Sequence, residues 1–425
     1  MNVQKTLNSI EVVPDKETRN RLLGELREFL KLLKNAAHYE KISADFFVGG
    51  SFAKGTLMKK EKYDIDIFAR FDWRYQDLTS LLAIIVKRAC GKRKVKIVRL
   101  HGSRDYFQIF VNKEILFEIV PVLKIKKPKE ARNVTDLSYF HVSYVKNKLR
   151  GNSKILKEIA VAKAFCKAQG VYGAESYIGG FSGYALECLV IHYKSFLKMI
   201  KNLLKVKDKL IIDPANHYKN KSEVMVSLNE GKLQGPIILI DPTWKERNVL
   251  AALSKETFLK FQKSARNFLR FPGEEFFTRK EVDIQKLKKE TKEKKASLIE
   301  LIASTNRQPG DIAGTKLKKF SNFLIGQLQQ YYEIIRCEFI YDGEQSARVL
   351  LIIKEKNGIK KIGPPVSLEK HAKAFRRKYD RVYEKNGRLC ADIAAQVSAK
   401  KFIIKFMLKY KEIIKSMQIE KLKVL

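Results

Sequence analysis

The chain has few cysteines, and those it has lie far apart. The five are Cys90, Cys166, Cys188, Cys337 and Cys390, and no two of them have CxxC spacing. This distribution argues against a cysteine-based zinc site and against a disulfide framework. Scattered, unpaired cysteines are typical of proteins that work in the reducing cytoplasm.

Long apolar runs are also missing. Residues 81–86 form only a short apolar patch, whereas a membrane-spanning helix needs about 20 apolar residues in a row. Glu11, Asp15 and Glu17 near the N-terminus do not fit a signal peptide. We therefore expect a soluble, cytoplasmic protein with no membrane partner.

Negative charge is scarce relative to positive charge. The 425 residues include 85 Lys and Arg against 46 Asp and Glu, which gives a formal net charge of +39. Such an excess favours binding to a polyanion, because neutralising phosphates releases condensed counterions. The lysines occur in every segment, so part of the charge is also compatible with a lysine-rich proteome. The charge predicts a nucleic-acid partner without locating its binding surface.

A glycine-rich turn, Gly49-Gly50-Ser51, is the first positive signal. Glycine has no Cβ, so such a turn can bring backbone N–H groups close to phosphate oxygens. We expect a strand at residues 45–48 leading into the turn. We expect a helix at residues 51–60, whose N-terminus adds partial positive charge to a phosphate site. Taken alone, a Gly-Gly-Ser sequence is more often just a flexible turn.

Three carboxylates accompany the turn. Asp64 and Asp66 flank Ile65 in an alternating stretch, which predicts a strand with both aspartates on one face. Glu118 lies inside an otherwise apolar strand, where a carboxylate needs a cation, a donor network or an exposed face. We expect Asp64, Asp66 and Glu118 to bind divalent metal ions. For Glu118, the alternatives are an antiparallel strand whose other face is solvated and an ion pair with Arg or Lys.

The element pattern predicts an α+β multidomain protein with room for two to four domains. Residues 1–140 are expected to form a mixed-sheet head. Its predicted helices are 16–39 and 78–88, and its predicted strands include 63–69, 95–100, 106–111 and 115–122. Residues 141–272 are expected to form a helical neck. Its predicted helices are 152–169, 183–204, 248–253 and 255–271.

The rest of the chain begins with a charged linker or solvated helix at residues 278–295. A βαββαβ order follows, which predicts a ferredoxin-like body within residues 273–398. Its predicted elements are strand 297–303, helix 315–330, strands 333–341 and 347–354, helix 368–379 and strand 389–398. The body lacks the aromatic cluster of base-stacking RNA-recognition modules. We therefore expect it to bind an RNA backbone or to act as a spacer. Residues 399–425 are expected to form a C-terminal helix or short tail.

Together these motifs resemble those of archaeal, class I, CCA-adding tRNA nucleotidyltransferases, in the polymerase β-like nucleotidyltransferase superfamily. The motifs are residues 49–56, 64–68, the Glu118 strand, 170–175, 180–184, 241–242 and 247–249, and residues 363–365 and 386–388 are similar to that family's C-terminal part. The first two belong to the whole superfamily. Residues 170–175 and 180–184 distinguish this family.

The resemblance implies two Mg²⁺ ions held by Asp64, Asp66 and Glu118. It also implies eight nucleotide-binding residues, with Gly50, Ser51, Lys54, His141, Lys163 and Tyr172 at the triphosphate and sugar, and Asp241 and Arg247 at the base of CTP or ATP. Two departures stand out. The family more often has Glu first and Asp last in the carboxylate set, and Lys54 replaces a usual Arg, which turns a bidentate contact into a point charge.

The implied reaction is untemplated addition of C, C and A to the 3′ end of tRNA. CTP and ATP are the donors, and two-metal nucleotidyl transfer releases pyrophosphate. Whether two copies of the chain form a homodimer is left open. Two alternatives remain: a poly(A) polymerase-like untemplated transferase, and a non-catalytic RNA-binding protein with a decayed head.

Overall fold

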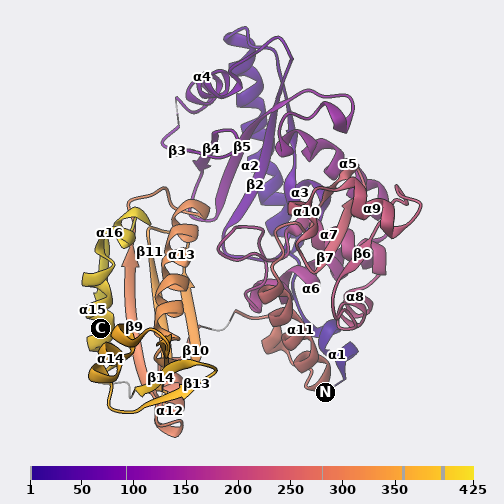
Figure 1. Ribbon diagram of the computed structural model, residues 1–425. Helices are drawn as coiled ribbons and strands as arrows, with labels where there is room; N and C mark the ends of the chain where they lie inside the picture. The colour runs from indigo at the N-terminus through magenta and orange to yellow at the C-terminus, as the bar shows by residue number, and fades with distance from the viewer. Residues whose placement is uncertain (1, 92, 280, 357–358, 394–397) are drawn as a thin grey trace. The chain divides into compact units, whose positions relative to one another are not determined.

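The computed structural model describes residues 2–91, 93–279, 281–356, 359–393 and 398–425. The chain forms two compact units, Met1–Lys280 and Glu281–Leu425 (Figure 1). Each unit combines helices with β-sheet, so the predicted α+β class is confirmed. The bounds of the four predicted domains stay predictions. Among the described residues, no helix is both long enough and apolar enough to cross a membrane.

The first unit is built around a five-stranded mixed sheet in the order β1-β2-β5-β4-β3. Its strands are β1 (Ala44–Val48), β2 (Tyr63–Phe71), β3 (Lys96–Leu100), β4 (Tyr106–Phe110) and β5 (Ile115–Leu123). The pair β2 and β5 is parallel, and the other neighbouring pairs are antiparallel. All five strands were predicted, because each alternates or concentrates apolar residues over a short stretch.

Two helices, α2 (Lys16–Tyr39) and α4 (Leu78–Cys90), pack on one face of this sheet (Figure 1). Ile65 and Ile67 of β2 are fully buried in the same core as these helices. Phe29 of α2 stacks on Phe117 of β5, with ring centroids 4.6 Å apart. Strand alternation therefore directs the neighbouring residues of β2 and β5, including the carboxylates, to the opposite face.

The helix predicted for residues 51–60 is wrong in its length. The helix α3 spans only Gly50–Lys54 and ends at Gly55, which has a left-handed φ of 72°. Glycine adopts this conformation without steric cost and commonly terminates helices. The glycine turn therefore leads into a single helical turn rather than a long helix.

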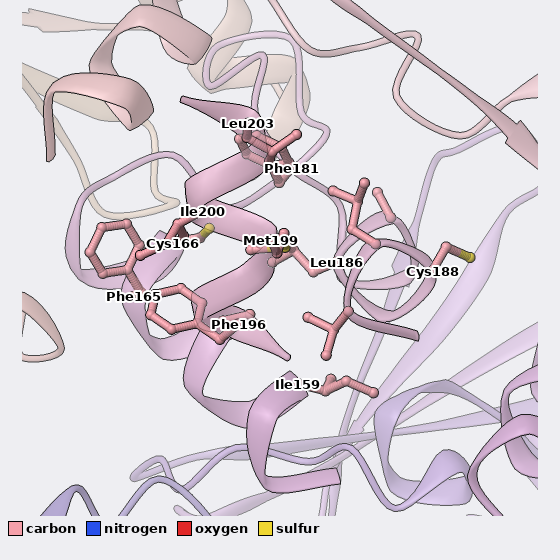
Figure 2. Packing of buried hydrophobic residues seen from close by; sticks show 14 of the residues in the cluster. Ile159, Phe165, Cys166, Phe181, Leu186, Cys188, Phe196, Met199, Ile200 and Leu203 are labelled. Atoms are coloured by element: carbon pink, nitrogen blue, oxygen red, sulfur yellow. The ribbon is translucent and has the colours of Figure 1, made fainter. Parts of the chain in front are cut away.

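Further helices complete the first unit, and several of them pack around a second core that includes Phe165, Phe181 and Phe196 (Figure 2). They are α1 (Val3–Ser9), η1 (Pro128–Glu130), η2 (Val134–Leu137), α5 (Ser138–Leu149), α6 (Ser153–Ala168), α7 (Gly183–Tyr193), α8 (Phe196–Leu203), α9 (Lys221–Ser227), α10 (Glu230–Leu233), α11 (Lys255–Arg270) and η3 (Glu274–Phe276). A small sheet in the order β6-β7-β8 accompanies them. Its strands are β6 (Leu210–Ile212), β7 (Ile237–Asp241) and β8 (Trp244–Asn248).

Two neck predictions need correction. The helix predicted for 183–204 is two helices, because Lys194 takes a left-handed φ of 66° and Ser195 caps α8. The helix predicted for 248–253 is wrong, because Asn248 ends strand β8. The Asn248 side chain accepts hydrogen bonds from the backbone N–H groups of Leu239 and Leu250. Such side-chain bonds compete with helix formation.

The second unit contains a four-stranded antiparallel sheet in the order β10-β11-β9-β15. Its elements are β9 (Ser297–Ser304), α13 (Asp311–Leu328), β10 (Tyr332–Tyr341), β11 (Ser346–Glu355), α15 (Ala399–Lys409), α16 (Lys411–Ser416) and β15 (Lys421–Val424). This is a ferredoxin-like βαββαβ arrangement, with α15 and α16 in the place of the second helix. The helix α12 (Ile284–Glu293) precedes it, inside the segment predicted as charged linker or solvated helix.

The predicted fourth strand of this sheet is wrong. Residues 388–393 form β14 (Arg388–Ile393), which belongs to a separate three-stranded sheet in the order β12-β14-β13. The other elements of this insertion are β12 (Ile359–Pro365), α14 (Glu369–Lys378) and β13 (Val382–Lys385). Residues 394–397 of the predicted strand lie outside the described residues. The predicted tail supplies the true fourth strand, and its Ile403, Phe406 and Ile414 belong to the core of the sheet.

Candidate active site

A cavity of about 390 Å³ lies in the first unit, between the carboxylate face of the large sheet and the neck helices. Four carboxylates and four lysines line it. The carboxylates are Asp64, Asp66, Glu118 and Glu187, and the lysines are Lys54, Lys60, Lys163 and Lys167. Gly50, Ser51 and Tyr172 also line it. The structure therefore brings eight of the eleven predicted site residues to one cavity.

The glycine turn and strand β2 are joined at this cavity. The Gly49 N–H donates to the Asp66 carbonyl oxygen over 2.8 Å. A Cβ added to Gly50, whose φ is +58°, would lie 1.6 Å from Asp66 Oδ2. Only glycine therefore fits at position 50, both for its backbone conformation and for the close approach of the Asp66 carboxylate.

Asp66 and Glu118 are direct neighbours in the parallel register of β2 and β5. Burial raises the pKa of Asp66, and the charge of Asp64 adds to this effect. Burial and the charge of Asp66 together raise the pKa of Glu118 to about 7, against a hydrogen bond from Gln108 that lowers it. These carboxylates are thus held close together at an electrostatic cost.

The donor set fits a divalent cation. Carboxylate oxygens are the ligands that Mg²⁺ prefers, and a cation beside Asp66 and Glu118 would offset their repulsion and their loss of hydration. Within the described residues, no group of three or more His, Cys, Asp or Glu side chains is preassembled around one point. Protein donors hold two of the carboxylates instead: Lys60 Nζ lies 2.6 Å from Asp64 Oδ2, and Gln108 Nε2 lies 2.6 Å from Glu118 Oε1.

Lys54 and Lys163, which line the same cavity, are bound to one carboxylate, Glu187 of α7. Lys54 Nζ lies 2.6 Å from Glu187 Oε2, and Lys163 Nζ lies 2.7 Å from Glu187 Oε1. Burial alone would raise the pKa of Glu187, and the two ammonium groups more than reverse this, so its pKa is about 2. Lys163 is thus a buried, paired residue rather than part of a solvated helix face.

Tyr172 lies against the start of α7. A Cβ added to Gly183 would come within 2.8 Å of the Tyr172 hydroxyl oxygen, so glycine at this position makes room for the ring. Tyr172 forms an isolated parallel bridge with Phe181, which brings the two predicted family motifs together. Burial raises the pKa of Tyr172, so the hydroxyl is neutral at physiological pH.

His141, Asp241 and Arg247 form a second cluster. Asp241 is fully buried, and its Oδ2 accepts from Arg247 Nη1 at 2.7 Å and lies 3.0 Å from His141 Nε2. Its Oδ1 accepts from the hydroxyls of Tyr184 and Thr243. Burial alone would raise the pKa of Asp241, and the hydrogen bonds and charges of His141 and Arg247 bring it well below its usual range.

Tyr184 connects this cluster to the cavity. Its ring stacks on that of His141 with centroids 4.1 Å apart, and Tyr184 itself lines the cavity. The Arg247 side chain keeps 24% of its surface exposed, whereas the Asp241 side chain has none. The Arg247 side chain is therefore partly accessible, and the buried Asp241 carboxylate holds its orientation.

Sequence reasoning missed several residues that line the cavity, among them Lys60, Lys167, Tyr184 and Glu187. Two signals could have found some of them. Lys60 precedes Asp64 by four residues, and Glu187 is an acidic residue inside the apolar run that forms α7. Neither signal identifies the partner residue.

Comparisons with known proteins agree with this geometry. The family model "tRNA nucleotidyltransferase, second domain" matches residues 157–278, which include Lys163, Tyr172, Asp241 and Arg247. The chain is 35% identical over 384 residues to the CCA-adding enzyme of Nanoarchaeum equitans, which covers 88% of this chain and 91% of the relative. It is 27% identical over 381 residues to the CCA-adding enzyme of Methanosarcina acetivorans, covering 87% and 80%.

Among solved structures, the chain is similar to that of Cid1, which is described as having RNA terminal uridylyl transferase activity. The TM-score is 0.52 at 11% sequence identity, over 66% of this chain and 98% of the Cid1 chain. At this identity the likeness establishes a shared nucleotidyltransferase fold and nothing finer.

Proposed function

The chain belongs to the family of CCA-adding enzymes, and from that premise we propose that it adds C, C and A, without a template, to the 3′ end of tRNA from CTP and ATP. The observation that carries the proposal is that Asp64, Asp66 and Glu118 line one cavity together with four lysines. The carboxylates suit metal ions and the lysines suit a triphosphate, so the cavity fits the phosphate end of the reacting nucleotide.

In each round, the 3′-hydroxyl oxygen of the tRNA bonds to the α-phosphorus of the nucleotide. The bond from that phosphorus to the β-phosphate oxygen breaks, pyrophosphate leaves, and the hydroxyl proton passes to solvent. Nucleotidyltransferases generally use divalent metal ions, and we assign two Mg²⁺ to Asp64, Asp66 and Glu118. When bound, such ions neutralise phosphate charge and lower the pKa of the attacking hydroxyl.

The residues of this chain divide the remaining tasks. The N–H groups of the turn at Gly50 and Ser51 bind phosphate oxygens, and Lys54 and Lys163 supply positive charge beside them. Tyr172 and His141 contact the sugar. Arg247 reads the edge of the base, and Asp241, which the family resemblance also places at the base, orients Arg247 from its buried position. Because the hydrogen-bond donors of Arg247 are held in fixed positions, a base that leaves them unpaired is rejected.

Incubation with a tRNA that lacks its 3′ CCA end tests the proposal. We expect the protein to add two C residues and one A residue when CTP and ATP are both present. Long A tails without C would favour the poly(A) polymerase-like alternative. No incorporation of either nucleotide by folded protein would favour the non-catalytic alternative.

Asp66→Asn tests the carboxylate assignment. The change keeps the side-chain shape and removes one negative charge beside Glu118, so the fold should persist. We expect incorporation to fall by at least about a thousandfold, since removing a charged catalytic group commonly costs that much. Single-turnover addition of C is the measurement. Asp45→Asn on β1 is the matched control, because Asp45 is exposed and pairs with Lys124 away from the cavity.

Unchanged incorporation by Asp66→Asn would contradict the metal assignment. A similar loss in Asp45→Asn would mean that the effect comes from general destabilisation. The cytoplasmic location stays a prediction.

A further inference from the structure

Glu187 is a buried carboxylate whose two oxygens hold two different parts of the cavity wall. It lies on α7 and is 0% exposed. Its Oε2 accepts from Lys54 at 2.6 Å, and its Oε1 accepts from Lys163 at 2.7 Å and from the Thr56 hydroxyl at 2.5 Å. A carboxylate with charge-assisted bonds on both oxygens fixes the groups that donate to it.

The two lysines are held in different ways. Lys163 is 2% exposed and donates to Glu187, to Thr56 Oγ1 at 3.0 Å and to the Thr56 carbonyl oxygen at 3.2 Å. These contacts use the three hydrogens of an ammonium group. Lys54 lies 5.5 Å from the Tyr184 ring centroid, and its contact with Glu187 uses one hydrogen of three. Lys54 can therefore donate to a ligand while it stays bound to Glu187.

Glu187 also keeps the Lys163 ammonium charged. Burial lowers the pKa of Lys163, and the negative charge of Glu187 opposes this. A buried ammonium without a counter-charge tends to lose its proton. Replacing Glu187 with a neutral residue would therefore not simply make the cavity more positive, because a lysine charge is weakened at the same time.

We propose that Glu187 is a positioning residue for the nucleoside triphosphate: it holds the ammonium groups of Lys54 and Lys163 in place on the cavity wall that receives the phosphates. This inference rests on the proposed function, because it takes the cavity as the nucleotide site. Glu187 itself acts through the two lysines and touches no reacting atom.

The test compares wild-type protein with Glu187→Gln in binding to a CTP analogue whose α–β bridge cannot be cleaved. We expect Glu187→Gln to bind it about tenfold more weakly, since a lost charge-assisted hydrogen bond is worth roughly that factor. In steady state, KM for CTP and for ATP should rise together, while KM for tRNA stays unchanged. Glu158→Gln is the matched control, because Glu158 accepts from the Phe196 N–H in the neck and does not line the cavity.

The outcomes separate the two proposals. Failure of the wild-type protein to bind the analogue overturns the proposed function, and this inference with it. Binding by the wild type and equal binding by Glu187→Gln overturns the positioning role alone. A lowered melting temperature with unchanged KM values would make Glu187 a merely structural residue, which also overturns the proposal.

A second pair of variants covers the case in which Glu187→Gln does not fold, since that change leaves Lys163 buried without its partner. Lys163→Met and Lys163→Met/Glu187→Gln both lack the buried ammonium. The difference in their affinity for the analogue therefore reports the positioning of Lys54 by Glu187 alone. We expect the double variant to bind the analogue at least about threefold more weakly than Lys163→Met. Equal binding by these two variants overturns the proposal.

Discussion

Glu187 and Asp241 are acidic side chains that are fully buried beside positive charge. A buried charge costs several kcal/mol unless partners restore the interactions that water provided, and removing one partner of such a pair is therefore costly. Each carboxylate has donors on both oxygens. At this scale, the site is a set of mutually dependent charges rather than a list of independent ligands.

Acid should weaken the first unit through Glu187. Its pKa is about 2 in the folded protein against an ordinary value of 4.5, so its contribution is fully present above pH 4.5 and is lost as the pH falls toward 2. The difference in unfolding free energy between wild type and Glu187→Gln should shrink by about 2 kcal/mol from pH 6 to pH 3. Urea unfolding at both pH values measures it. A difference that stays constant would contradict the ion pair.

Among the secondary-structure elements, the break between α7 and α8 depends most clearly on the conformation of a single residue. Lys194 adopts a left-handed backbone there and is exposed, so its side chain is replaceable. Lys194→Gly should raise the unfolding free energy by about 0.5–1 kcal/mol, because glycine removes the strain of the positive φ. Denaturant midpoints measure the change.

Lys201→Gly provides the contrast on α8, where Lys201 is exposed in regular helix. It should lower stability by about 0.5–1 kcal/mol, because glycine costs that much inside a helix. If both glycine variants were destabilised equally, the left-handed assignment at Lys194 would be wrong.

The helix α15 tests whether the predicted tail belongs to the body. Ile403 is fully buried in the core of the four-stranded sheet, and Leu408 on the same helix is 73% exposed. Ile403→Ala should lower the stability of the second unit by about 2–4 kcal/mol through a lost apolar contact and a residual cavity. Leu408→Ala should change it by less than about 0.5 kcal/mol. Equal effects of the two substitutions on stability would indicate that α15 does not pack against the four-stranded sheet.

Charge dominates at the scale of the whole molecule. With a formal net charge of +39, we expect tRNA binding to depend steeply on salt. Affinity for tRNA should fall by at least about a hundredfold between 50 and 200 mM monovalent salt, as counterion release predicts for many phosphate contacts. Binding titrations at four salt concentrations measure the slope. An affinity for tRNA that does not change with salt would argue that the positive charge is compositional background.

Much of the site was predictable because its signals are local. The Gly49–Gly50 turn and the alternation around Ile65 each lie within one short segment, where strand period and glycine freedom determine geometry. The same holds for most helices and strands. The exceptions are elements decided by single residues, such as Gly55 ending α3 and Asn248 replacing a helix by a turn.

The local chemistry follows from the order of residues alone: two aspartates on one face of β2, a glycine turn before them, a third carboxylate on an apolar strand, and the strong positive charge. Which charges are paired depends on the tertiary fold. Lys54 and Glu187 are 133 residues apart, and His141 and Asp241 are 100 residues apart. It likewise placed β15 rather than β14 beside β9. Such contacts depend on the packing of distant elements, and no local periodicity encodes them.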